Sequence, residues 1–142
     1  MERKIAALPQ EVTPEKRIGW AYNKFMSPSD FLSQKLSVQC DSLAGEINKT
    51  YQHLPWALKN EAVSRLKRTV MALSKEVLKA QESESPVPTQ KHLKAAQSLV
   101  HECAPLMNLC LRKALLSPDL HNRWIKRLNA IGIQLEEWLK AC

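Results

Sequence analysis

The stretch from Trp124 to Lys140 constrains the fold of this chain most, because its apolar residues recur at the spacing of one helix face. Five of them follow one another at intervals of four and three residues: Trp124, Leu128, Ile131, Leu135 and Trp138. That rhythm places all five on a single stripe of an α-helix. Ile125, Gly132 and Leu139 widen the stripe beyond a coiled-coil seam. A face this wide needs more than one helical neighbour, as in a helix bundle.

Three earlier stretches repeat the pattern and predict the neighbouring helices. A helix over about 29–53 would carry one apolar stripe: Leu32, Leu36, Cys40, Leu43, Ile47, Tyr51 and Leu54. A helix over about 56–81 would carry a second: Val63, Leu66, Val70, Leu73, Val77 and Ala80. A helix over about 89–116 would carry a third: Leu93, Ala96, Val100, Cys103, Met107, Cys110 and Ala114. Pro105 lies inside this third helix and should kink or break it, because proline removes a backbone hydrogen bond.

The connections between these stretches are short and predict the topology. Leu54-Pro55 ends the first helix, and residues 82–88, E-S-E-S-P-V-P, are predicted to form an acidic, proline-broken loop. Ser117-Pro118-Asp119 combines a capping residue, a first-turn proline and an acid, which together favour the start of the last helix. Because short connections make consecutive helices antiparallel, the sequence predicts an all-α, up-down-up-down four-helix bundle over residues 29–142.

An N-terminal arm, residues 1–28, precedes the predicted bundle. It holds three prolines and no long apolar period, although residues 14–25 can form a short helix. We favour the interpretation that this arm packs on the bundle or stays partly disordered, because chain ends usually do little. The alternative is a partner-binding arm that presents three aromatic side chains: Trp20, Tyr22 and Phe25.

The composition narrows the class of protein. Of the 142 residues 44% are apolar and three are Gly, which suits a single helical domain. The sequence contains no run of about 18 apolar residues, so no membrane span is expected. The apolar Ile-Ala-Ala-Leu patch before Pro9 is too short for a secretory signal. The net charge of +7 favours an anionic partner.

The four cysteines are expected to be free thiols. Cys103 and Cys110 would lie two turns apart on one helix, about 10 Å, which is too far for a disulfide. Cys40 also falls at core spacing, and Cys142 ends the chain. Free thiols of this kind fit a reducing, cytoplasmic compartment.

No arrangement of residues predicts catalysis. The four histidines belong to no C-x-x-C or H-x-x-x-H pattern, so zinc is not expected, and His101 and Cys103 would point to different sides of a helix. The adjacent Glu136 and Glu137 also face different directions, so they do not make an acid–base pair. No Gly-rich phosphate loop is present. We therefore expect neither enzyme activity nor a metal or other cofactor.

Basic side chains give the strongest functional signal. From residue 59 to residue 79, six basic residues stand against two acidic ones, and four of the basic ones fall opposite the apolar stripe: Arg65, Arg68, Lys75 and Lys79. Four more occur at the end of the third helix and early in the fourth: Arg112, Arg123, Lys126 and Arg127. An ordinary solvated face, with Glu61 and Arg65 as a helical ion pair, would explain the same pattern.

Two residues admit more than one interpretation. Trp56, at the Leu-Pro corner, is either a hydrophobic staple for the second helix, which we favour, or an exposed stacking group. Gly132 costs a helix about 1 kcal/mol relative to Ala, which would be tolerated where another helix approaches closely. That helix would belong either to the same bundle or to another subunit. Trp124 and Trp138 are expected in the core or at a subunit interface.

Two stretches resemble a known family. They are L-P-W-A-L-K-N-E-A-V-S-R-L-K-R-T-V, from Leu54 to Val70, and L-L-S-P-D-L-H-N-R-W-I-K-R-L-N-A-I-G-I-Q-L-E-E-W-L-K, from Leu115 to Lys140. With the order of signals over about four-fifths of the chain, they resemble the four-helix-bundle family of proteins encoded in 23S rRNA intervening sequences. That family includes the accessory variability determinant of diversity-generating retroelements. The 28-residue arm and the loop at residues 82–88 depart from the family pattern.

The resemblance implies a ring-like, basic homopentamer that binds nucleic acid and a reverse transcriptase without activity of its own. Together with the basic excess over three helices, it favours contacts to the RNA or DNA backbone rather than to bases. The expected contacts are the eight basic residues named above. The alternative is a protein–protein adaptor without a nucleic-acid role, which docks its partner through the N-terminal arm.

Overall fold

The computed structural model describes residues 28–58 and 61–142, which form four α-helices, one short 3-10 helix and no strand. The α-helices are α2 (Pro28–His53), α3 (Glu61–Glu82), α4 (Pro86–Arg112) and α5 (Pro118–Ala141). The 3-10 helix η1 (Trp56–Leu58) lies between α2 and α3, where the periodicity predicted an unbroken helix from residue 56. The short helix expected over 14–25, like almost all of the N-terminal arm, lies outside the described residues.

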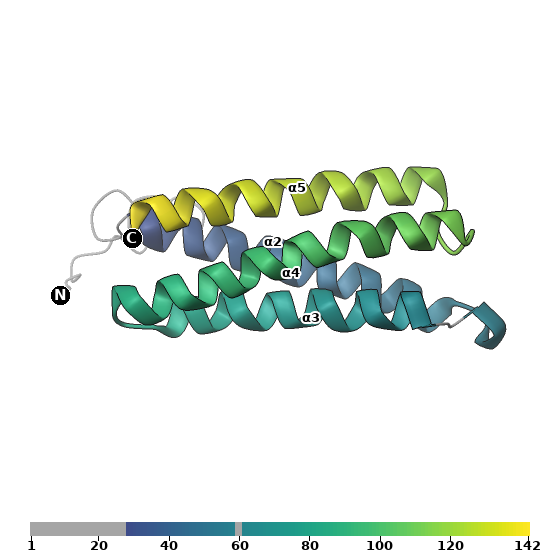
Figure 1. The fold of residues 1–142 in the computed structure, drawn as a ribbon, viewed down its shortest axis with the longest axis horizontal. Helices are drawn as coiled ribbons and strands as arrows, with labels where there is room; N and C mark the ends of the chain where they lie inside the picture. Colours follow the sequence, from purple (N-terminus) through teal and green to yellow (C-terminus); the bar gives the residue numbers. More distant parts are fainter. Residues whose placement is uncertain (1–27, 59–60) are drawn as a thin grey trace, which may run out of the picture.

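The four helices form an antiparallel bundle in which each helix packs on two neighbours (Figure 1). α2 packs on α3, α3 on α4 and α4 on α5, and α2 also packs on α5 to close the bundle. Consecutive helices run in opposite directions along the long axis. The all-α four-helix bundle predicted from the apolar spacing is therefore confirmed.

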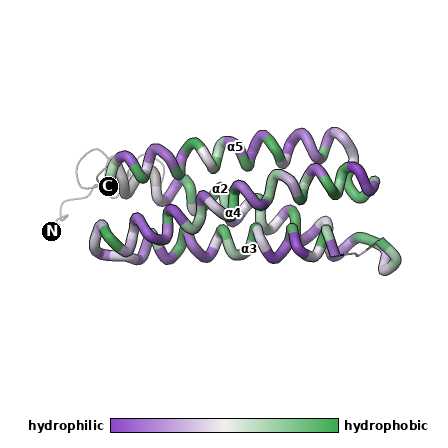
Figure 2. The backbone as a smooth tube through the Cα atoms, viewed as in Figure 1, coloured by the Kyte–Doolittle hydropathy of each residue, from purple (hydrophilic) through white to green (hydrophobic). Residues whose placement is uncertain are grey.

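Each helix turns its apolar stripe toward the centre of the bundle, and Figure 2 shows hydrophobic and hydrophilic segments alternating along all four helices. The stripe of α5 is almost fully buried: Trp124, Leu128, Ile131, Leu135 and Trp138. The predicted stripe of α3 is buried as well: Val63, Leu66, Val70, Leu73, Val77 and Ala80. In α2 the buried set ends at Ile47, and Tyr51 and Leu54 pack on the core while partly exposed. Trp124 and Trp138 are thus core residues of the monomer.

The third helix is shifted toward the N-terminus relative to its prediction. It starts at Pro86. Proline is tolerated there because the N–H that it lacks would have no acceptor within the first turn of a helix. The loop predicted over 82–88 shortens to residues 83–85. α4 continues across Pro105, so this proline does not break the helix.

The C-terminal end of α4 is closed by Ala114, which the sequence pattern had placed in the apolar stripe. Ala114 is exposed and has a φ of 59°, in the left-handed region. Its N–H donates to the Leu111 carbonyl at 3.0 Å, and the N–H of Leu115 donates to the Cys110 carbonyl at 2.9 Å. This pair of bonds is a Schellman motif, which normally uses glycine at the left-handed position. The cap ends α4 at Arg112, four residues before the predicted end.

One predicted feature of α5, the N-cap at Ser117, is seen in the structure, and a second, the close approach at Gly132, is not. The Ser117 side chain accepts a hydrogen bond from the Leu120 N–H at 3.1 Å, as expected for an N-cap followed by proline. At Gly132, an added Cβ would meet Cγ1 of Val100 at 3.6 Å, which is ordinary van der Waals contact. The neighbour of Gly132 is therefore α4 of the same bundle, and this contact leaves room for a methyl group and does not require glycine.

Candidate nucleic-acid interface

The basic stripe of α3 lies on the outer face of the bundle. All four of its side chains are exposed: Arg65, Arg68, Lys75 and Lys79. At about 100° per residue they fall within roughly 80° of arc, on the side of the helix away from the buried stripe. Lys79 follows Arg65 by 14 positions, which at a rise of 1.5 Å per residue corresponds to about 21 Å. The local sequence of α3 therefore places four exposed cations, in two pairs, along one helix face, and we call these four residues the cationic ridge.

Two members of this ridge form weak ion pairs. Arg68 approaches Glu61 at 3.8 Å, and their side chains are 64% and 83% exposed. The predicted pairing of Glu61 with Arg65 is replaced by this contact one turn further along α3. Lys79 approaches Glu76 at 3.7 Å, and Glu76 also contacts Nδ1 of His92 on α4 at 2.8 Å. Because exposed pairs contribute about 0–1 kcal/mol, they leave these cations able to exchange partners.

Two of the predicted cations on α5 are engaged with an acid that the sequence analysis did not single out. Arg123 and Arg127 both donate to the Glu46 carboxylate of α2, and the Trp124 indole N–H donates to it at 2.8 Å. Arg127 also donates to the Ser42 hydroxyl at 2.6 Å. We call Glu46, Arg123, Trp124 and Arg127 the α2–α5 cluster. It joins the two helices that close the bundle.

The α2–α5 cluster holds Glu46 in its charged form. Partial burial raises the pKa of the Glu46 carboxyl, but the hydrogen bonds from Arg123, Trp124 and Arg127 outweigh burial and leave the pKa below its ordinary value. Glu46 flanks the buried Ile47 in sequence, as many solvated helical acids do, so no sequence signal marks it as a partner of α5. Arg123 and Arg127 are thus partly neutralised within the protein.

The last two predicted cations are more open to solvent. Lys126 is exposed on α5, and no ion pair forms on it in the described part of the chain. Arg112 is exposed at the end of α4, next to the exposed Lys113 that caps this helix. The α4–α5 corner that carries Arg112 lies at the same end of the bundle as η1 (Figure 1). This end therefore brings together cations from α3, α4 and α5.

Trp56 does not staple α3, and that preferred interpretation is wrong. Its side chain is 88% exposed, and η1 contains no buried residue. Leu54 and Tyr51 pack on the core at this corner instead, and Nζ of Lys67 lies 4.7 Å from the centre of the Tyr51 ring. Tyr51 and Leu54 thus supply the apolar contacts with the core at this corner, and Trp56 lies in solvent.

Three of the four thiols are buried within the bundle. Cys40, Cys103 and Cys110 are buried and free, and Cys142 is exposed and free. Burial, followed by the nearby Asp41 and Cys103, raises the pKa of Cys40 to about 12. Burial, followed by Glu102, raises the pKa of Cys103 to about 12, so neither thiol ionises near neutral pH. No group of three or more His, Cys, Asp or Glu side chains among residues 33–58 and 61–142 has the geometry to hold a metal ion.

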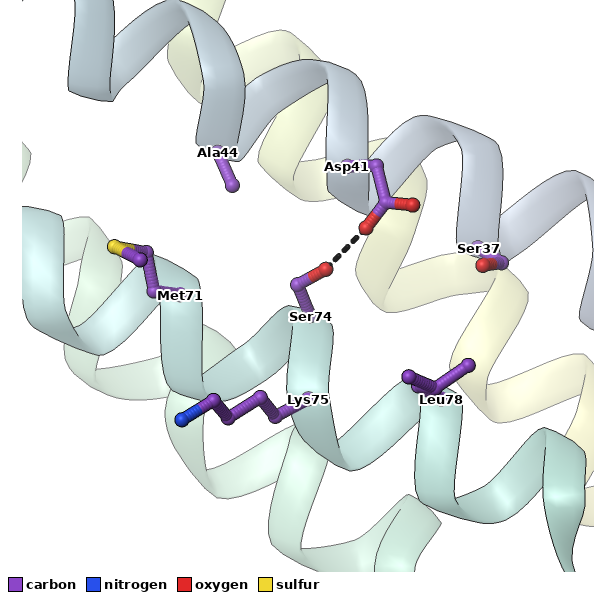
Figure 3. A pocket seen from close by; sticks show the side chains of 7 residues that line it. All are labelled: Ser37, Asp41, Ala44, Met71, Ser74, Lys75 and Leu78. Carbon is purple, nitrogen blue, oxygen red and sulfur yellow. Dashed lines mark hydrogen bonds between the residues drawn. The ribbon is translucent and has the colours of Figure 1, made fainter.

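A shallow groove of about 380 Å³ separates α2 from α3 beside the cationic ridge (Figure 3). Its apolar lining comes from Ala44 of α2 and from Met71 and Leu78 of α3, and the last two are 43% and 47% exposed. The Ser74 hydroxyl donates to the Asp41 carboxylate across the groove, which satisfies the acid locally. Lys75 is thus both a member of the ridge and part of the groove wall.

Comparisons with known proteins do not assign the chain to a family. No protein-family model matches it, and neither a curated protein nor a solved structure shows significant similarity to it. The resemblance noted in the two sequence stretches therefore stays a prediction. Among the described helices, none combines the length and the apolar character needed to cross a membrane.

Proposed function

We propose that this chain is a non-enzymatic protein that binds the phosphate backbone of RNA or DNA through the outer face of α3. The observation that carries the proposal is the cationic ridge, in which Arg65, Arg68, Lys75 and Lys79 are all exposed along one helix face. Lysine and arginine side chains bind phosphates through charge and without base recognition, which suits a surface lacking any base-reading motif.

The dimensions of the ridge support contact with several phosphates. Its length of about 21 Å matches roughly six nucleotide steps at about 3.4 Å per step. The carboxylates paired with Arg68 and Lys79 are solvent-accessible or shared, so a phosphate can replace them at little cost. Arg112 and Lys126 are further exposed cations on α4 and α5, whereas Arg123 and Arg127 contribute less because Glu46 already binds them.

Three further parts of the proposal come from the sequence, the first two from the family resemblance and the third from the free thiols. They are association with a reverse transcriptase, assembly into a ring-like homopentamer, and a cytoplasmic location. Mass measurement on the purified chain tests the pentamer, and copurification with a diversity-generating reverse transcriptase tests the partner. A monomeric mass or a failure to copurify would reject that part while leaving the phosphate contacts to be judged separately.

The central test is a salt series with a four-residue variant. Arg65, Arg68, Lys75 and Lys79 are replaced by Gln, and binding to an RNA duplex, a DNA duplex and a single strand of each is measured between low and physiological salt. Each phosphate contact contributes about 0.9 to the log–log salt slope, so this variant should reduce the slope by about 3 to 4. The matched control replaces four other exposed lysines by Gln: Lys35, Lys49, Lys91 and Lys94.

The two variants remove the same charge, so they separate a local site from a general electrostatic effect. An equal loss for both would reject the α3 ridge as the binding site. Absence of duplex and single-strand binding by the natural chain at low salt would reject the nucleic-acid function altogether.

A protein–protein adaptor is the second candidate, and the α2–α3 groove favours it. Met71 and Leu78 expose apolar surface in a concave setting, which is typical of contacts with another protein. A chain lacking residues 1–27 keeps all of α2 and tests the arm as the docking element. Under the adaptor hypothesis this deletion, or Met71→Ser with Leu78→Ser, abolishes partner capture, whereas neutralising the ridge does not.

A further inference from the structure

The η1 corner presents an aromatic side chain to solvent at one end of the bundle. Trp56 is 88% exposed and Leu58 is 42% exposed, although tryptophan is usually largely buried. The corner is ordered by local hydrogen bonds: the Leu58 N–H donates to the Pro55 carbonyl at 2.9 Å and the Leu54 N–H donates to the Tyr51 carbonyl at 3.2 Å. Trp56 is therefore exposed on a backbone that local hydrogen bonds hold in a defined conformation.

The charge of the bundle is concentrated in the half that carries this corner. That half comprises residues 41–58, 61–71 and 100–129, and it contains nine basic and five acidic side chains. The opposite half, residues 33–40, 72–99 and 130–142, contains six basic and five acidic side chains. The exposed Trp56 thus lies in the more positive half of the bundle.

Several of these cations lie on the segments that meet near η1. Arg65 and Arg68 are in the first two turns of α3, directly after the corner, and Arg112 and Lys113 lie at the α4–α5 corner at the same end of the molecule (Figure 1). All four are exposed. Trp56 and the N-terminal end of the α3 ridge therefore lie at the same end of the bundle (Figure 1).

We propose that Trp56 is a stacking platform for an unpaired base, and that the natural ligand of the cationic ridge is therefore single-stranded RNA or DNA. This inference deepens the proposed function and rests on it. An exposed aromatic ring beside a positive groove or ridge is the combination by which proteins bind single strands without sequence preference. Bases in a duplex are already stacked on each other and do not offer a free face to such a ring.

The test compares four forms of the full chain on three nucleic-acid ligands and on vesicles of anionic phosphatidylserine. The forms are the natural chain, Trp56→Ala, Trp56→Phe and, as a matched control, Val87→Ala, which removes an apolar side chain that is 76% exposed at the opposite end. The ligands are a single-stranded adenine oligonucleotide of about 12 nucleotides, an abasic oligomer of the same length, and a duplex. Circular dichroism checks that each variant keeps its helical content and melting temperature.

Loss of one stacked base should weaken binding of Trp56→Ala to the adenine oligonucleotide about tenfold. The slope against salt should stay unchanged, because no phosphate contact is lost. Trp56→Phe should lose much less, and neither the abasic oligomer nor the duplex should distinguish the variants. Fluorescence adds a direct reading: the natural chain should be quenched on binding, and Trp56→Ala should lose that quenching.

Other results overturn the inference in distinguishable ways. Equal binding of the adenine oligonucleotide by the natural chain and Trp56→Ala rejects the stacking role while the phosphate-binding function stands. Absence of binding to every ligand rejects both. A Trp56→Ala variant that loses affinity for vesicles of anionic phosphatidylserine but not for the oligonucleotide assigns the corner to a membrane surface instead.

Discussion

Replacement of Glu46 should show how much of the bundle's stability depends on the α2–α5 cluster. In Glu46→Ala, the indole N–H of Trp124 loses its acceptor at 2.8 Å, and Trp124 is 1% exposed. A buried donor left unpaired costs about 1–3 kcal/mol. The Arg123 side chain is 60% exposed and can return to water, so the lost ion pairs add only about 0.5–1 kcal/mol. We expect a total loss of about 2–3 kcal/mol.

Glu46→Gln removes the negative charge of the side chain but keeps an oxygen that can accept a hydrogen bond. Its amide oxygen can still accept from the Trp124 indole, so the expected loss is about 1 kcal/mol. Urea unfolding followed by helical circular dichroism measures both variants, and unchanged m-values would show that the midpoint shifts report stability. Ser37→Ala, a neutral change elsewhere on α2, serves as the control. A loss below about 0.5 kcal/mol for Glu46→Ala would refute the reasoning, because a buried indole would then not need this partner.

The same comparison has a pH dependence whose sign follows from the lowered pKa of Glu46. A carboxyl with a lowered folded-state pKa binds its proton more readily when unfolded, so its stabilising effect is complete above the unfolded pKa of about 4.3. The effect is lost as the pH falls through the lower folded-state pKa. The stability difference between the natural chain and Glu46→Gln should therefore be constant near pH 7 and shrink below about pH 4. A difference that grows on acidification would contradict this assignment.

Three further predictions concern the backbone caps, a helix crossing and the thiols. Ala114→Gly should raise the free energy of unfolding by about 1 kcal/mol, since Ala114 has a φ of 59°, and urea unfolding at neutral pH measures it. Gly132→Ala should also stabilise, by up to about 1 kcal/mol, because the new Cβ meets Val100 at 3.6 Å without overlap; a loss in the same assay would show that the crossing is tighter. A thiol reagent at neutral pH should modify Cys142 rapidly and the three buried cysteines only on unfolding, so a second fast thiol in the mass spectrum would refute their burial.

The helices could be predicted from the sequence because burial on one face imposes a period that local pattern can detect. The interval of three and four residues from Trp124 to Trp138 is the clearest case, and all five of its members are buried. The ends of helices follow different rules. Ala114 continues the apolar period, yet the Schellman bonds that close α4 require it to adopt a left-handed backbone conformation. Periodicity contains no information about such a cap.

Trp56 illustrates a second limit, which concerns competition for one position. A staple requires a hydrophobic residue before the cap and a contact within the next helix, and the sequence around Leu54-Pro55 supplies both. Tyr51 and Leu54 precede Trp56 and already pack on the core at the corner. Which of several apolar residues fills such a site depends on the path of the chain through the turn. The path between α2 and α3 includes η1, which the pattern did not predict.

The basic residues show the third limit, and it bears on function. Cations can be counted in a sequence and assigned to a helix face, but the sequence does not show which of them have an acidic partner on another helix. The sequence predicted Arg123 and Arg127 as phosphate contacts on the same grounds as Arg65. In the structure, the packing of α2 against α5 brings Glu46 to both Arg123 and Arg127. A cation that pairs with an acid on another helix is less available to bind a ligand. The free positive charge therefore concentrates on α3 and at the η1 end, and a single strand bound there would have both a row of phosphate contacts and a ring on which to stack a base.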